Sequence, residues 1–180
     1  MKSLIRVIGI DDGYFSSKKG TTLLVGVIYR LDNRVEGILS QKIKVDGKDS
    51  TKKIIKMVKD SKFTSQIKCV FLHGVNFAGF NVADVKELNK KLRVPIITCF
   101  RRNPDMKGIR RALSNLSDSG KRFNLILNAG KIYKAERIHF QCTGIEATEA
   151  KAMIKKCRVH SLLPEPLRLS HLIASGVTKK

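Results

Sequence analysis

The sequence predicts an α/β fold with a mixed five-stranded sheet and helices on both of its faces. Three β-branched segments near the N-terminus are separated by short turns, which makes them antiparallel neighbours. Beyond residue 49 the hydrophobic period becomes helical, and helical segments then alternate with short apolar strands. A helix between two such strands favours a right-handed parallel crossover. Three antiparallel strands followed by α-β-α-β is the element order of a ribonuclease H-like fold.

The elements follow from composition and period. After the first strands, Ile54, Ile55 and Val58 fall on one helical face, with lysines around the remainder. Five segments are predicted to be strands: residues 4–10, 21–30, 34–45, 67–72 and 94–99. Further helices are predicted at residues 82–92, 104–116 and 147–157 and in the closing segment LPEPLRLSHLIASG, which ends at Gly176.

Two apolar runs, 123–128 and 137–142, do not fix an element type. The chain of 180 residues has no repeat, low-complexity tract or linker. We therefore expect one ribonuclease H-like domain over residues 1–180.

Net charge is the strongest compositional signal. The chain has 36 Lys and Arg against 15 Asp and Glu, a formal charge of +21. A polyanion such as DNA or RNA is the expected partner. With no Trp and 6% aromatic residues, phosphate contacts should outweigh base stacking. A generally basic proteome or a surface adapted to high temperature are alternative explanations of the charge.

Other signals exclude several classes of protein. No apolar run approaches the ~18 residues that span a membrane, and the N-terminus lacks a secretory signal, so a cytoplasmic location with no membrane partner is expected. The sequence has no P-loop and no G-x-S-x-G motif, and we expect no organic cofactor. Four cysteines without a C-x-x-C pair argue against a zinc site and against disulfides: Cys69, Cys99, Cys142 and Cys157.

Two polar residues end strands that should be neighbours in the sheet. Asp11 closes VIGID and His73 closes VFLH, and ligands gather at such strand ends in open α/β sheets. Asp11 would bind a divalent cation at a scissile phosphate, and His73 would bind metal or transfer a proton. The alternatives are an Asx turn before Gly13 and a histidine packed beneath a loop.

Phosphodiester hydrolysis with two metals needs several converging carboxylates. The candidate acids are Asp11, Asp12, Asp49, Asp84 and Glu149. Asp49 and Asp84 also suit helix starts, and Glu149 suits a solvated helix surface. A neutral imidazole at position 73 is a poor ligand for Mg²⁺ but accepts Mn²⁺ or Zn²⁺.

Backbone and cationic groups near His73 could contact nucleic acid. The candidates are Gly74, Asn76, Arg101, Arg102 and Arg168. Glycine-spaced loops approach phosphate closely, and arginines clamp it. Ordinary turns and solvated surface charge are the alternative interpretation.

Several blocks together resemble a known family. IGIDDGYF, VFLHGVNFAGFN, VPIITCFRRNPD and LPEPLRLSHLIAS resemble the endonuclease V-like family of mainly archaeal proteins (domain of unknown function family 99) over nearly the whole chain. The family is more distantly similar to endonuclease V, a Mg²⁺-dependent ribonuclease H-like nuclease that cuts near deaminated purines.

The resemblance to endonuclease V implies roles for five residues. Its first-strand aspartate falls on Asp11, its next acid near Asp49 and a late acid near Glu149. Its second strand-end aspartate falls on His73, and a lysine falls on Arg101. The histidine removes a charge and an oxygen ligand, which should weaken Mg²⁺ binding. The nuclease's aromatic-proline wedge has no counterpart in QKIKVDGKDS, which places inosine specificity in doubt.

The sequence thus leads to a nucleic-acid-binding protein of the endonuclease V-like family whose metal-dependent nuclease site is reduced or lost. An active divalent-metal-dependent endonuclease is the alternative, with His73 as a Mn²⁺ ligand or as a general base. A basic scaffolding protein is a third hypothesis. The choice of DNA or RNA, the base preference and the oligomeric state are left open.

Overall fold

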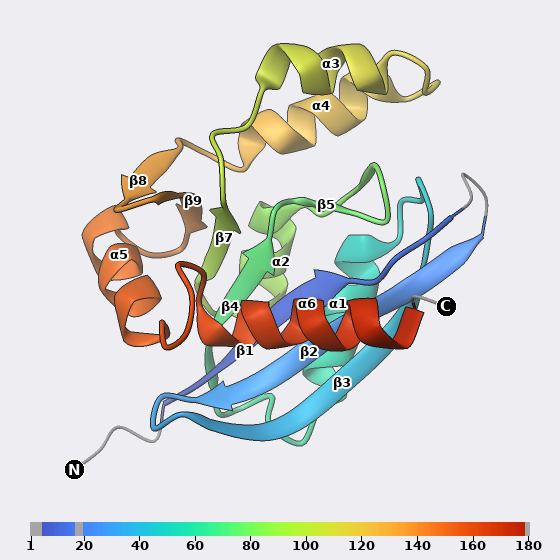
Figure 1. Ribbon diagram of the computed structural model, residues 1–180. Coiled ribbons are helices and arrows are strands. Elements are labelled where there is room, and N and C mark those ends of the chain that lie inside the picture. The colour runs from blue at the N-terminus through green and yellow to red at the C-terminus, as the bar shows by residue number, and fades with distance from the viewer. Residues whose placement is uncertain (1–4, 17–19, 179–180) are drawn as a thin grey trace.

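The computed structural model describes residues 5–16 and 20–178, and it is dominated by one large sheet (Figure 1). The strands of this sheet follow the order β3-β2-β1-β4-β7-β9-β8. Their bounds are β1 Arg6–Asp12, β2 Thr21–Arg30, β3 Arg34–Lys44, β4 Ile67–His73, β7 Ile96–Phe100, β8 Tyr133–Ala135 and β9 Ile138–Thr143. A separate small hairpin pairs β5 (Asn76–Phe77) with β6 (Asn81–Val82).

The strand pairing matches the predicted topology in its first five strands. β1, β2 and β3 pair antiparallel, whereas β1, β4 and β7 pair parallel. The expectation of five strands was too small, because the run 137–142 forms β9, and β8 and β9 extend the β7 edge in antiparallel pairing. The first predicted strand begins at residue 4, which lies outside the described residues.

The described chain has six helices, and five of them, all except α4, lie where a helix was predicted. They are α1 Ser50–Lys59, α2 Val85–Leu92, α3 Met106–Leu113, α4 Ser119–Asn128, α5 Ala147–Lys156 and α6 Glu165–Thr178. The helix expected over 82–92 starts later, because the Asp84 side chain caps it by accepting from the backbone N–H groups of Lys86 and Glu87. The run 123–128 belongs to α4, and α6 continues through Gly176.

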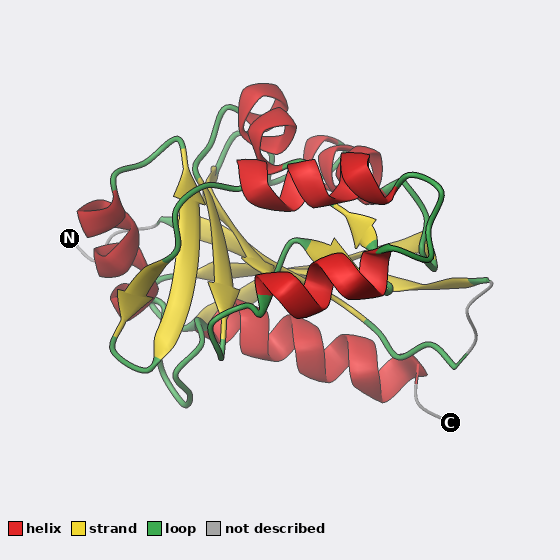
Figure 2. Cartoon of the chain, turned by 90° about the horizontal axis from the view of Figure 1, so that it is seen from above, coloured by secondary structure: helices red, strands yellow, loops and turns green. Residues whose placement is uncertain are grey.

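Alternation along β1 divides the core into two layers. Ile8 packs in a cluster with Ile54 of α1 and Leu88 of α2, whereas Val7 points to the other face and packs in a cluster with Ile154 of α5. Figure 2 shows helices on both sides of the sheet. Val7 of β1 and Cys69 and Phe71 of β4 therefore face the α5–α6 side of the sheet.

Helix α6 lies unusually close to β1, which it crosses in Figure 1. A Cβ atom at Gly9 would lie 2.3 Å from the carbonyl carbon of Pro166 and 2.6 Å from the backbone nitrogen of Leu167. Only glycine fits at such a backbone approach. The first turn of α6 is thereby fixed against the centre of the sheet.

No helix in the described part of the chain is long and apolar enough to cross a membrane.

Candidate active site

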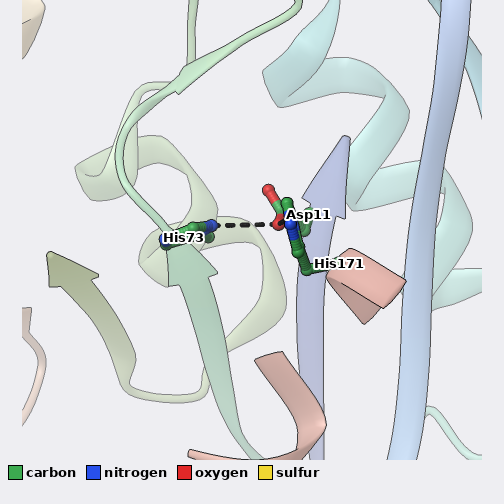
Figure 3. A group of neighbouring side chains, drawn as sticks. All are labelled: Asp11, His73 and His171. Atoms are coloured by element: carbon green, nitrogen blue, oxygen red, sulfur yellow. Dashed lines mark hydrogen bonds and ion pairs between the residues drawn. The ribbon is translucent and has the colours of Figure 1, made fainter. Parts of the chain in front are cut away.

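The ends of β1 and β4 bring Asp11 and His73 together, as the topology predicted. Asp11 is 3% exposed, and its Oδ2 lies 2.9 Å from Nδ1 of His73 (Figure 3). Both residues occupy odd positions on adjacent parallel strands, so both side chains point to the α6 face.

Helix α6 adds a third group, His171, to the same carboxylate. Its Nδ1 also lies 2.9 Å from Oδ2 of Asp11, and the two imidazole rings meet edge to face with their centroids 5.9 Å apart. One ligating atom from each of the three residues lies within 4.8 Å of the others. Among the described residues, no other group of three or more His, Cys, Asp or Glu side chains meets this criterion. We call Asp11, His73 and His171 the Asp-His-His centre.

His171 was missed in the sequence, although a signal was present. Leu167 and Ala174 of α6 are buried, and His171 lies four residues after one and three before the other. Residues at this spacing share a helical face. His171 therefore lies on the stripe that α6 turns towards the sheet.

Hydrogen bonding to Asp11 shifts the pKa of His73. The hydrogen bond to Asp11 raises the pKa of His73, burial and the nearby Arg101 charge oppose the increase, and the Asp11 charge supports it. With hydrogen on Nδ1, each imidazole donates to Oδ2 of Asp11; with hydrogen on Nε2 instead, each Nδ1 offers a lone pair next to that oxygen. In the second arrangement, two imidazole nitrogens and one carboxylate oxygen face the same point.

Asp12 points to the opposite face and does not join the centre. Its Oδ2 accepts a hydrogen bond of 2.8 Å from the backbone N–H of Ala78, which fastens the loop that follows His73. Burial raises the pKa of Asp12 to about 6, and the neighbouring Asp11 charge adds to the increase. Alternation along β1 thus separates Asp11 and Asp12 onto opposite faces of the sheet.

Two other acidic candidates lie away from the Asp-His-His centre. Oδ1 of Asp49 lies 2.6 Å from Nδ2 of Asn81 and 3.2 Å from the backbone nitrogen of Lys44, at the start of α1. Glu149 is exposed in the first turn of α5. Neither belongs to the cluster of ligating atoms around Asp11. The register with endonuclease V that assigned them roles therefore does not bring them to Asp11.

The arginine candidates lie in three different environments. Arg101 follows β7 and is close enough to His73 for its charge to act on the histidine's pKa. Arg102 borders a cavity on the other side of the sheet edge. Nε of Arg168 lies 2.9 Å from Oε2 of Glu165, so its guanidinium is held in an ion pair within α6.

The cavity beside Arg102 opens next to the Asp-His-His centre. It has a volume of about 290 Å³. Its walls include Gly74, Val75, Asn76, Phe100, Arg102, Pro104, Met106, Ile109, Ile126 and Gln141. The side-chain Oδ1 of Asn76 is buried and has no hydrogen-bond partner among the described residues. We call this cavity the Asn76 pocket.

Comparison with known proteins identifies the family. The family described as Endonuclease dU matches residues 3–178. A UPF0215 protein of Methanopyrus kandleri is 38% identical over 99% of this chain and 94% of its own length. A UPF0215 protein of Methanothermobacter thermautotrophicus is 40% identical over 99% of this chain and 90% of its own length.

Solved structures extend the comparison. An Archaeoglobus fulgidus protein of unknown function has a TM-score of 0.92 at 36% identity, covering 98% of this chain and 99% of that one. The catalytic domain of human endonuclease V has a TM-score of 0.63 at 11% identity, covering 95% and 81%. Ciona intestinalis endonuclease V, in complex with a 24mer DNA containing an inosine, has a TM-score of 0.58 at 14% identity, covering 92% and 82%.

The likenesses to endonuclease V concern the fold, which is ribonuclease H-like. Together with the match along almost the entire chain, they bear out the resemblance found in the sequence. The chain belongs to the Endonuclease dU family of endonuclease V-like proteins.

Proposed function

We propose that this protein is a metal-dependent endonuclease whose reaction centre is the Asp-His-His centre. The observation that carries the proposal is the convergence of Asp11, His73 and His171 from β1, β4 and α6 on one carboxylate oxygen. They meet where ligands gather in open α/β sheets. The sequence alone favoured a nuclease site that is reduced or lost. That prediction did not include His171, which supplies a third ligating group.

The donor set fits one divalent cation. One carboxylate oxygen and two imidazole nitrogens suit Mn²⁺, Fe²⁺ or Zn²⁺ better than Mg²⁺, which prefers oxygen ligands. When bound, such an ion supplies positive charge to a phosphate and lowers the pKa of water that attacks it. Asp49, a metal candidate in the sequence, is engaged by Asn81 and Lys44 and is left out of the proposed ligand set.

The two histidines differ in their access to solvent. The His73 side chain is 26% exposed, whereas that of His171 is 48% exposed. His171 is therefore better placed to exchange a proton with bulk water. His73, which is more buried and faces the Arg101 charge, is better placed to hold its orientation next to a phosphate.

We place the target base in the Asn76 pocket. Nucleases and glycosylases that act at a damaged base turn it out of the duplex into a close-fitting pocket. Deamination of cytosine replaces the lone pair at N3 by an N–H donor. Asn76 lines this pocket, and the oxygen of its carboxamide, turned towards the base, would accept such a donor but would oppose the cytosine lone pair. The family description, Endonuclease dU, agrees with a uracil base.

Thymine presents the same hydrogen-bonding edge as uracil, so a second contact must distinguish them. Exclusion of its 5-methyl group would fall to apolar walls such as Phe100 and Ile109. A methyl group in an apolar pocket changes binding by about 1–3 kcal/mol. Discrimination against thymine should therefore be weaker than discrimination against cytosine.

DNA is the proposed substrate. The Ciona intestinalis endonuclease V structure holds DNA. The formal charge of +21 on this chain suits a polyanion, and contacts to phosphate would supply most of the affinity.

Cleavage of a defined oligonucleotide panel tests the proposal. Single- and double-stranded DNA with one deoxyuridine, one deoxyinosine or neither is incubated with the protein in Mn²⁺ or Mg²⁺. We expect cutting near deoxyuridine with Mn²⁺, and a loss of at least about 100-fold in Asp11→Asn and His171→Asn. His160→Asn changes an exposed histidine outside the centre and should cut normally.

Two results would overturn this function. Equal cutting by the native protein and Asp11→Asn would assign the activity to a contaminant. Tight DNA binding without cutting in either metal would favour the binding protein with a lost nuclease site.

The Asn76 pocket has its own test. Asn76→Leu removes the acceptor and keeps a similar volume, so cutting at deoxyuridine should fall towards the rate at undamaged cytosine. If the ratio of the rates at deoxyuridine and at cytosine stays unchanged, the target base does not bind in this pocket.

A further inference from the structure

A second cavity lies on the α5–α6 side of the sheet, beyond Arg101. It has a volume of about 180 Å³. Its lining residues are Arg101, Arg137, Ile138, Ser161, Leu162 and Leu163. We call it the Arg101–Arg137 cavity. None of the roles proposed above uses Arg137 or the segment 161–163.

The two arginines of this cavity carry charge that nothing nearby compensates. Arg101 and Arg137 are exposed, and neither makes an ion pair or side-chain hydrogen bond with the described residues. The acids around them are already engaged. Glu136 pairs with Arg158 at 2.6 Å, and Glu165 pairs with Arg168. The cavity is therefore an anion-attracting site by default.

Strand pairing relates the position of the cavity to the Asp-His-His centre. Cys99 of β7 pairs with His73 of β4, and Arg101 follows two residues later on the same face. In the next strand pair, Phe100 lies opposite His139 of β9, which places Arg137 beside the end of β7. A chain leaving the centre and crossing the carboxyl ends of β4 and β7 and then the start of β9 would meet Arg101 first.

The loop that forms the far wall is held in place. Nε of Arg158 donates a hydrogen bond to the carbonyl oxygen of Ser161, and the Ser161 hydroxyl donates to the carbonyl oxygen of Leu163. Leu162 between them is 38% exposed. An apolar wall next to two guanidinium groups suits a deoxyribose attached to its phosphate.

We propose that the Arg101–Arg137 cavity binds one backbone phosphate of the substrate strand, next to the bond that the centre cuts. This inference rests on the proposed function and deepens it, because it assigns the path of the strand. Guanidinium groups bind phosphate oxygens through paired N–H donors, which makes two convergent arginines a specific site. Contact with phosphate carries no sequence information, so the cavity would position the strand.

DNA binding measured apart from cleavage tests this assignment. Arg101→Gln and Arg137→Gln are made in an Asp11→Asn background, and affinity for a deoxyuridine oligonucleotide is titrated by fluorescence anisotropy. We expect each variant to bind about tenfold more weakly, with the slope of log K against log salt smaller by about one. Arg93→Gln is the matched control. Arg93 is exposed and precedes β7, so it lies at the opposite end of that strand from Arg101.

A neutral-backbone scan identifies the phosphate. Each oligonucleotide carries one uncharged methylphosphonate, and the series places it at successive positions. At one position the Asp11→Asn protein should lose affinity relative to the unmodified oligonucleotide. At that same position the protein with both Asp11→Asn and Arg137→Gln should bind the modified and unmodified oligonucleotides equally well. Normal binding by the Arg137→Gln variant, or additive losses at every position, would overturn the proposal.

The outcome is separable from that of the nuclease proposal. If the arginine variants bind weakly while the native protein never cuts, the strand path stands and catalysis fails. If Asp11 proves essential for cutting while the Arg137→Gln variant binds DNA normally, the nuclease proposal stands and the strand path fails.

Discussion

Asp11 is the residue on which the site depends. A carboxylate that is 3% exposed is costly to ionise without partners, and here two imidazoles share one of its oxygens. Its other oxygen accepts from the backbone N–H of Asp12 at 3.0 Å. The hydrogen bonds hold all three side chains of the centre in one arrangement, ready for a ligand.

The identity of residue 73 should set the choice of metal. His73→Asp restores an oxygen ligand and a negative charge, which Mg²⁺ requires more than Mn²⁺ does. We expect cleavage in Mg²⁺ to rise by about tenfold or more over that of the native protein, with a smaller change in Mn²⁺. Initial rates in each metal measure this, and His160→Asp is the control. An unchanged metal preference would argue that residue 73 is not a ligand.

Burial of Asp12 should make the protein less stable as pH rises. Its pKa is about 6 in the folded protein and about 3.8 when unfolded, so the folded state binds the proton more tightly. The free energy of unfolding therefore falls between about pH 4 and pH 6, by up to about 3 kcal/mol.

Asp12→Asn removes this titration and keeps an oxygen for the N–H of Ala78. The variant should match the native protein near pH 4 and exceed it by up to about 3 kcal/mol at pH 7 in urea unfolding. Asp60→Asn, at an exposed carboxyl after α1, serves as control. A difference between variant and native protein that stays constant with pH would contradict the account.

Among the site residues, the sequence predicts which ones meet only where the strand order fixes their positions. Asp11 and His73 end adjacent parallel strands, so their meeting follows from topology. His171 depends on how α6 crosses the sheet, which no local pattern determines. Asp49 and Glu149 were assigned by register with a distant nuclease, but Asp49 contacts Asn81 at the start of α1 and Glu149 is exposed in the first turn of α5.

At the level of elements, the close packing of α6 on β1 positions His171. Gly9 allows the backbone of Pro166 to approach, and a further contact joins Gly13 to Thr178 at the other end of α6. The Thr178 hydroxyl oxygen accepts from the backbone N–H of Tyr14 at 2.6 Å. Helix α6 is thus held against β1 at both ends, with His171 between them.

A methyl group at Gly9 should displace α6. Gly9→Ala would place Cβ 2.3 Å from a backbone carbon, so the helix must shift, and we expect a loss of about 2–4 kcal/mol in the free energy of unfolding. Gly120→Ala is the matched control, because Gly120 lies in α4 with open space around it and alanine favours helix. Equal stability of Gly9→Ala and the native protein would contradict the close approach.

Most elements were predictable because their hydrophobic periods are clear, but two runs were not. FNLILN at 123–128 is apolar enough for a strand, yet it forms part of α4, where Ile126 is buried and Leu127 is 51% exposed. Short apolar runs do not distinguish strand from helix, and packing decides. The run 137–142 becomes a strand because the free edge of β7 is available to pair with it.

In the whole molecule, the three candidate sites lie at the same end of the sheet, where β1, β4 and β7 end. The Asp-His-His centre and the Arg101–Arg137 cavity lie on the α5–α6 side, and the Asn76 pocket lies on the side of α3 and α4. In the proposed complex, the ends of β4 and β7 therefore separate the extruded base from the backbone of its strand.

The charge of +21 should make DNA binding steeply dependent on salt. For about four phosphate contacts, affinity falls by about 100-fold between 50 and 200 mM salt. Anisotropy titrations with undamaged DNA over this range measure the slope. A change of less than about threefold would contradict binding through phosphate.

If Asp11, His73 and His171 hold one divalent cation, calorimetric titration of the purified protein with Mn²⁺ will detect it. We expect one bound ion per chain, with affinity lowered by at least about tenfold in His73→Asn and in His171→Asn and unchanged in His160→Asn. Native affinity in both His73→Asn and His171→Asn, or no Mn²⁺ binding by the native protein, would contradict it.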